Sequence, residues 1–167
     1  MSTSDSSSER TADDGEETEA ERLDRNLGEM LQELRVALPG VQVLFAFLLV
    51  VPFNQRFTSL TDFERDTYFV ILLLTGLASV FLIAPTAHHR LHFRRGRRKE
   101  IVFAANALSI AGLATLAIAM TGSIFFIGHV VFGTAAAVAV GIAFALLFGV
   151  MWFAAPLKLL ARLYGDK

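Results

Sequence analysis

One long uncharged stretch constrains the fold of this chain more than any other feature. Residues 101–157 contain no Asp, Glu, Lys or Arg, and a soluble domain does not accommodate 57 consecutive residues of this kind. A helix that crosses the hydrocarbon core of a bilayer needs about 20 apolar residues. The stretch is therefore long enough for two spans and a short connection. With a mean hydropathy of +0.53, the whole chain is predicted to be a multi-span membrane protein.

Charge is distributed unevenly along the chain. Residues 1–35 hold eleven acidic residues and four arginines, whereas residues 36–167 hold eleven basic and five acidic residues. This pattern predicts a disordered acidic tail over residues 1–22, followed by a basic membrane domain. The tail has no basic segment leading into an apolar core, so a cleaved signal peptide is not expected. Cysteine is absent, which excludes disulfides and thiolate metal sites.

Apolar periodicity divides the rest of the chain into helices. Leucines and a methionine recur every three or four positions over residues 23–35, which predicts an amphipathic helix in the membrane interface. A break at Pro39 is expected to separate it from the spans, and the second span is expected to stop at Pro85. The spacing of Thr61 and Glu64 predicts a capping box at the start of that span. The first predicted span is residues 36–53, and the second helix continues through residues 68–84. The third and fourth spans are residues 101–120 and 131–155, and residues 121–123 are expected to open the turn between them.

These spans predict an all-α, integral membrane four-helix bundle over residues 36–157, followed by a short end at 158–167. Basic residues gather in three of the segments that flank the spans: the N-terminal flank, the loop after the second span and the C-terminal flank. Only Arg56 and Arg65 fall on the opposite side. The positive-inside rule then places both termini in the cytoplasm, with the protein in the cell membrane.

Small residues recur at every fourth position in the fourth predicted span. They form a ridge that allows another helix backbone to approach closely. A matching row in the third span predicts a tight hairpin between the two, although the same ridge is also able to form a homodimer. The fourth-span ridge is Gly133, Ala137, Gly141, Ala145 and Gly149, and the third-span row is Ala107, Ala111, Thr115 and Ala119.

Few polar side chains fall inside the predicted spans. Gln42 and Asn106 lie at similar depths in the first and third spans, which predicts a buried pair of hydrogen-bonded amides. A cation or water pathway lined by these two residues is the alternative. Ion-coupled transporters usually keep a charged residue in the membrane, and the predicted spans contain none.

Four histidines are candidates for pH response or metal binding. His88 and His92 have the spacing of two metal ligands on one helix face, and His89 lies between them. The neighbouring bases would repel a cation, so a pH response is favoured over a metal site. His129 is expected in a loop or at a helix edge on the opposite side, with proton sensing as the alternative. No cofactor is predicted.

A basic cluster between the second and third spans is the clearest interaction signal. Juxtamembrane bases attract anionic lipid headgroups by about 1 kcal/mol each. Lipid contact is therefore the leading interpretation, with docking of the acidic tail or of a protein partner as the alternative, and nucleic-acid binding is not expected. The cluster consists of Arg90, Arg94, Arg95, Arg97, Arg98 and Lys99.

Two strings of residues carry a resemblance to a known family. Residues 30–53, Phe57 and residues 82–96 resemble an uncharacterised family of small four-span membrane proteins found mainly in actinobacteria. The likeness covers about residues 23–153, and automated labels for such proteins sometimes read sodium:proton antiporter. The resemblance implies the four-span fold and brings no functional residue with it.

The sequence thus leaves two function classes open. The first is a non-enzymatic accessory or structural membrane protein, associated with lipids, with copies of itself or with another membrane protein. The second is a small cation or proton transporter. The lack of an intramembrane carboxylate favours the first, and no nucleophile–base pair indicates an enzyme.

Overall fold

The computed structural model of this protein is all-α, as predicted. It describes residues 19–92 and 98–158. Four helices within these ranges are long and apolar enough to cross a membrane. They are α1 (Glu19–Val50), α2 (Asp62–His92), α3 (Arg98–Phe132) and α4 (Thr134–Phe148). Two short 3-10 helices, η1 (Val51–Phe53) and η2 (Gln55–Ser59), connect α1 to α2, and a π-helical segment, η3 (Gly149–Ala154), continues α4.

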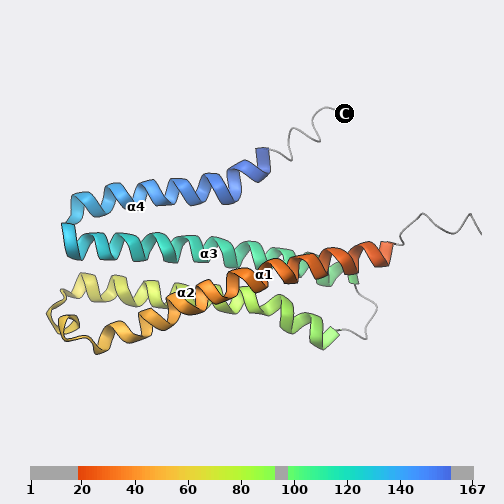
Figure 1. The fold of residues 1–167 in the computed structure, drawn as a ribbon, viewed down its shortest axis with the longest axis horizontal. Helices are drawn as coiled ribbons and strands as arrows, with labels where there is room; N and C mark the ends of the chain where they lie inside the picture. Colours follow the sequence, from red (N-terminus) through yellow and green to blue (C-terminus); the bar gives the residue numbers. More distant parts are fainter. Residues whose placement is uncertain (1–18, 93–97, 159–167) are drawn as a thin grey trace, which may run out of the picture.

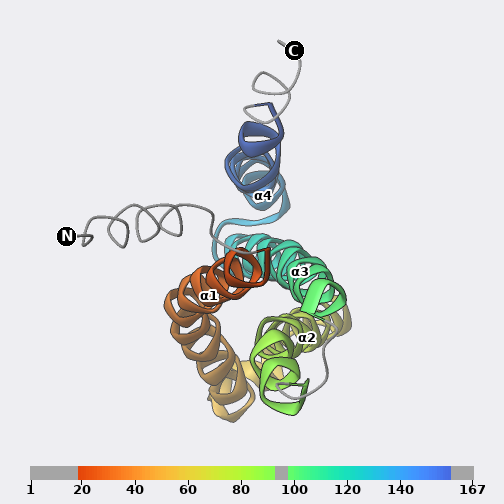
Figure 2. The ribbon, with the colours of Figure 1, turned by 90° about the vertical axis from the view of Figure 1, so that its right-hand side faces the viewer.

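The four helices run up and down along one long axis (Figure 1). The α1–α2 connection and the α3–α4 turn lie together at one end, which we call the connection end. Viewed along the axis, α1, α2 and α3 form a three-helix group, and α4 lies outside this group, next to α3 (Figure 2). In agreement with this view, α4 packs on α3 and makes no comparable contact with α1 or α2.

The two prolines expected to end helices lie inside them instead. Pro39 is within α1 and Pro85 within α2, so the predicted break and stop at these residues are wrong. Proline removes one backbone donor, but in an apolar helix its neighbours can satisfy the freed carbonyl. Pro85 is fully buried, so packing holds the helix together around it. The segment 23–35 therefore continues directly into the first span as one helix.

The turn predicted at residues 121–123 is also wrong. These residues lie within α3, where the Ser123 hydroxyl donates to the Ala119 carbonyl at 2.8 Å and so needs no partner outside its own helix. The chain reverses at Gly133, whose φ of +86° is the one positive φ among the described residues. Glycine adopts this backbone conformation without the steric cost that a Cβ brings. The fourth span accordingly starts at Thr134.

The core lies among α1, α2 and α3 in two apolar clusters. The first joins Leu34 and Val41 of α1 to Ala78 and Leu82 of α2 and Leu116 of α3. The second cluster lies toward the connection end and consists of Leu48, Tyr68, Ile71 and Phe126. There the Tyr68 hydroxyl donates to the Leu48 carbonyl near the end of α1, where the residue four positions on is Pro52, which has no N–H to donate.

Helices α2 and α3 come closest where Gly112 faces Leu82. A Cβ atom built on Gly112 would lie 2.7 Å from Leu82 Cγ and 3.3 Å from the Leu82 backbone nitrogen. Leu82 is completely buried and has no room to move. The hydrogen atom of Gly112 thus allows the packing of the two central helices, a role that the sequence analysis did not assign to it.

We predict that Gly112→Ala destabilises the protein. The added methyl group overpacks a filled site, and such overpacking typically costs about 1–3 kcal/mol. Thermal unfolding of the purified protein in detergent measures the change. Gly40→Ala is the matched control, because a Cβ there meets nothing within 4 Å and alanine favours the helix. Equal effects of the two substitutions would contradict the close contact at Gly112.

Candidate functional site

The connection end holds a polar cluster that begins with the capping box of α2. The Thr61 backbone N–H and hydroxyl donate to Glu64 Oε2 at 2.8 and 2.9 Å. The Glu64 backbone N–H donates in return to the Thr61 hydroxyl at 3.3 Å. These contacts confirm the capping box predicted from the spacing of the two residues. They also hold the Glu64 carboxylate in one orientation.

The other oxygen of this carboxylate faces an imidazole on α3. Glu64 Oε1 lies 3.9 Å from His129 Nε2, and the two side chains are only 15% and 22% exposed. The second ring nitrogen, Nδ1, lies 3.3 Å from the hydroxyl of Thr134, the first residue of α4. We call Thr61, Glu64, His129 and Thr134 the acid–histidine cluster. It joins the starts of α2 and α4 to the end of α3.

Two aromatic rings enclose the imidazole. Phe125, one turn earlier on α3, stacks on it with centroids 6.0 Å apart and an interplanar angle of 15°. Phe63 of α2 approaches at 5.8 Å in an edge-to-face arrangement. Beside these rings the imidazole is 22% exposed, and its two nitrogens face Glu64 and Thr134.

Thr61, Glu64 and His129 were singled out from the sequence, but Thr134 and the contact among the four residues were not. Glu64 was assigned only to the capping box, and His129 was expected in a loop or at a helix edge. With a turn at 121–123, nothing would bring these two side chains together. The signal that was missed is Gly133, a typical residue immediately after a helix, which places His129 in the last turn of α3.

The predicted pair of buried amides is not formed. Gln42 and Asn106 are both exposed on their helices, and no hydrogen bond joins them within the described residues. On α1 the inward position belongs to Val41, which is 1% exposed, so Gln42 points away from the core. On α3 the inward positions belong to Ala105 and Ser109. In a membrane, the two amides would therefore lie on the outer surface of the bundle.

The basic cluster lies outside the part of the chain whose side chains are described. Arg94, Arg95 and Arg97 fall in the gap between the described ranges. Arg90, Arg98 and Lys99 belong to the ends of α2 and α3, but only their backbone is described, as is the case for His88, His89 and His92. Contact of these residues with lipid or with a partner stays a prediction.

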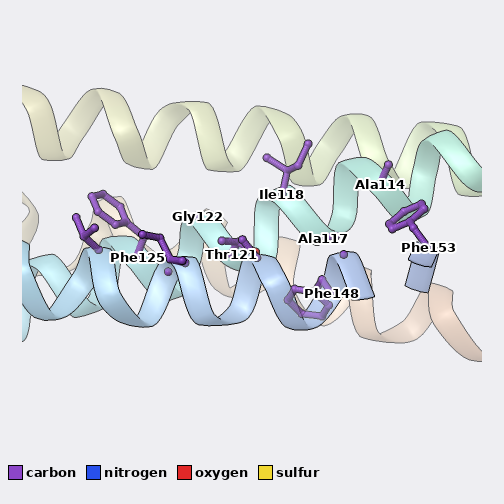
Figure 3. A pocket seen from close by; sticks show the side chains of 13 residues that line it. Ala114, Ala117, Ile118, Thr121, Gly122, Phe125, Phe148 and Phe153 are labelled. Carbon is purple, nitrogen blue, oxygen red and sulfur yellow. The ribbon is translucent and has the colours of Figure 1, made fainter. Parts of the chain in front are cut away.

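A long apolar groove between α3 and α4 is the second candidate site. Its volume is about 720 Å³, and its lining is almost entirely carbon (Figure 3). Helix α3 contributes small residues and two larger side chains, and α4 with η3 forms the other wall. The lining includes Ala114, Ala117, Ile118, Thr121, Gly122 and Phe125 from α3, and Gly141, Ala145, Phe148, Gly149 and Phe153 from the other wall.

The predicted ridge of small residues packs on α3 along only part of its length. Ala137 is fully buried, and its Cα would lie 3.2 Å from a Cβ on Gly128. Gly141 packs on Phe125, and a Cβ there would lie 3.6 Å from the Cβ of Phe125. Ala145 and Gly149 line the open groove, and Gly133 forms the turn instead of joining the ridge.

On α3 the contact surface differs from the predicted row. Ala119 is buried, but Ala107 is exposed. The residues that contact α4 include Phe125 and Gly128, because α3 extends twelve residues beyond the predicted end of the third span at Met120.

We predict that Gly141→Leu separates α4 from α3. A leucine side chain extends well beyond the Cβ position and would collide with the Phe125 ring, at a cost of about 1–3 kcal/mol. A lower unfolding temperature in detergent would show this loss. Gly28→Leu is the control, since Gly28 is exposed on α1 and a Cβ there meets nothing within 4 Å. If Gly141→Leu unfolds at the wild-type temperature, the described contact between these helices is wrong.

Comparison with known proteins identifies the family of this chain. The model of a family of unknown function, DUF6328, matches residues 16–156. No curated protein and no solved structure matches the chain. The family match covers all four apolar helices and both candidate sites. The chain therefore belongs to the DUF6328 family.

Proposed function

We propose that this protein is a four-span membrane protein that acts without catalysis, by association of its fourth helix with a second copy of the chain. Large apolar side chains face outward on every long helix, as expected where lipid surrounds a bundle. Phe47, Val80, Phe103 and Leu146, one from each helix, are all more than 60% exposed. The role is that of an accessory or structural protein of the cell membrane.

Charge placement supports an orientation with both termini in the cytoplasm. The start of α1 and the end of η3 lie at the end of the bundle away from the connection end (Figure 1). The end of α2 and the start of α3 lie at that same end, and they carry Arg90, Arg98 and Lys99, whose charges favour anionic headgroups. Arg56 and Arg65 are the two bases of the connection end, which faces outward in this proposal.

The position of α4 is the observation that carries the proposal. Two of its residues, Ala137 and Gly141, are buried, and both lie near the turn. The same ridge continues into the groove, where a Cβ on Gly149 would meet nothing within 4 Å. In lipid, helices associate mainly by close packing of small residues. A helix that enters the groove would continue the contact that α3 and α4 already make within one chain.

A second copy fits this groove because α4 offers both surfaces that such a contact requires. Its ridge lines the groove, and its remaining surface carries exposed alanines at 135, 136, 139 and 143. These small side chains allow α4 of one copy to approach the groove of the other closely. In this arrangement, small residues on two faces of α4 contact other helices: the ridge within the groove and the exposed alanines on the opposite copy.

The hydroxyl groups inside the bundle favour this function over a transporter. Each of the serines and threonines concerned donates to a carbonyl four residues earlier in its own helix, so its polarity is directed to the backbone. Thr75 and Ser109 are buried and bonded in this way to Ile71 and Ala105, at 2.8 and 2.9 Å. Ser79 and Thr115 follow the same pattern. Hydroxyls engaged in this way have a hydrogen-bond acceptor within their own helix, so their presence in the bundle is explained without a transported ion.

Single-cysteine cross-linking in native membranes tests the proposal, because the chain has no cysteine of its own. Ala145→Cys places a thiol in the groove, and oxidation is expected to give a covalent dimer of twice the monomer mass. Val80→Cys is the matched control, since it is 62% exposed on α2, a helix that does not line the groove.

A dimer from Ala145→Cys and little or none from Val80→Cys would support the proposal. Equal dimer yields at both positions would indicate random collision and contradict it. A cross-linked product with a mass other than twice the monomer would overturn the choice of a second copy as the occupant.

A further inference from the structure

We propose that Glu64 and His129 form a proton-binding site that fastens the α3–α4 turn to the start of α2. This inference rests on the acid–histidine cluster and is independent of the groove. The cluster joins three helices at the connection end, and Thr134 links it directly to α4. Its state of protonation therefore bears on how firmly the outer helix is held.

Thr61 orients the carboxylate of Glu64 independently of any contact with His129. Two hydrogen bonds from Thr61 hold Oε2, which leaves Oε1 directed at the imidazole. A fixed carboxylate loses little conformational freedom when an ion pair forms, unlike the long side chains of a surface pair. The acid of this site is thus already in place for a charged imidazole.

Protonation of His129 adds an attraction that the neutral ring lacks. With both ring nitrogens protonated, Nδ1–H donates to the Thr134 hydroxyl while Nε2–H faces Glu64. The separation of 3.9 Å suits an ion pair but exceeds a hydrogen-bond length. Because both side chains are mostly buried beside Phe63 and Phe125, their attraction is screened less than that of a surface pair.

Other charged groups of the connection end are engaged elsewhere. Asp62 and Arg65 pair with each other at 3.6 Å on the exposed surface, and Arg65 also reaches the Leu60 carbonyl. Asp66 is exposed, and Arg56 lies in a separate groove beside Phe126 and Val130. Helix α4 has no charged or titratable residue. Within the described part of the chain, Glu64 is therefore the charged group that faces His129.

The direction of the pH dependence follows from the charges. The attraction is present when His129 is protonated and Glu64 is ionised, and it is lost as the pH rises through the range in which histidine gives up its proton. Acidic conditions within this range should therefore hold α4 in place, and alkaline conditions should release the contact. The packing of Ala137 and Gly141 on α3 remains in both states.

Thermal unfolding of the full-length protein in detergent at about pH 5.5 and about pH 8 tests this site. From the alkaline to the acidic pH, the unfolding temperature of the wild type should rise by about 2–4 °C more than that of Glu64→Gln or His129→Gln. Asp62→Asn is the matched control, because the Asp62 carboxylate lies in the same helical turn but pairs with Arg65 instead of His129. It should keep the wild-type pH dependence.

Wild-type pH dependence in Glu64→Gln would overturn the proposal, as would its loss in Asp62→Asn. A second measurement leaves the cluster unaltered and so stands even if those variants fold poorly. Spin labels on Val80→Cys and Leu146→Cys, both more than 60% exposed, report the distance between α2 and α4. Dilution with unlabelled protein suppresses the signal from pairs of labels on different copies. The distribution should narrow at acidic pH, and an unchanged distribution would contradict the proposal.

Discussion

The structure depends on α3, the helix against which each of the other three packs. Gly112 allows the backbone of α2 to come close on one side, and Gly128 does the same for α4 on another. The inner surface of α3 also contributes Leu116 and Phe126 to the two core clusters. Because α3 runs unbroken to Phe132, its last turn reaches the connection end, where His129 meets Glu64.

Polar and apolar contacts between helices lie in different parts of the bundle. Along the helices, hydroxyl groups bond to their own backbone, and packing rests on small residues and shape. The contact between Glu64 of α2 and His129 of α3 lies at the connection end. In this arrangement the long faces of the protein are suited to association with other helices.

Local patterns along the sequence predicted the features that depend on local chemistry. The four apolar helices and the capping box of Thr61 and Glu64 are examples, since both arise from residues close together in the chain. The effect of Pro39 and Pro85 depends instead on whether neighbouring helices stabilise the backbone around them. The run of Thr121, Gly122 and Ser123 has the composition of a turn, but α2 and α4 pack on either side of it and keep it helical.

Contacts between helices were the hardest features to predict. Gln42 and Asn106 have matching depths, but depth does not specify which way each side chain points around its helix. The pairing of Glu64 with His129 required the correct end of α3, and an error of about twelve residues in that end concealed it. The same error moved the predicted packing row on α3 away from the surface that α4 contacts.

The continuity of α3 is thus the central claim, and cysteine labelling tests it most directly. Single cysteines at Ser123 and at Thr134 are exposed to a membrane-impermeant maleimide in opened membranes, in a chain that otherwise has no thiol. The structure predicts rapid labelling at Thr134, beside the turn, and protection at Ser123, inside the third span. Rapid labelling at Ser123 with protection at Thr134 would place the turn at 121–123 and contradict the account.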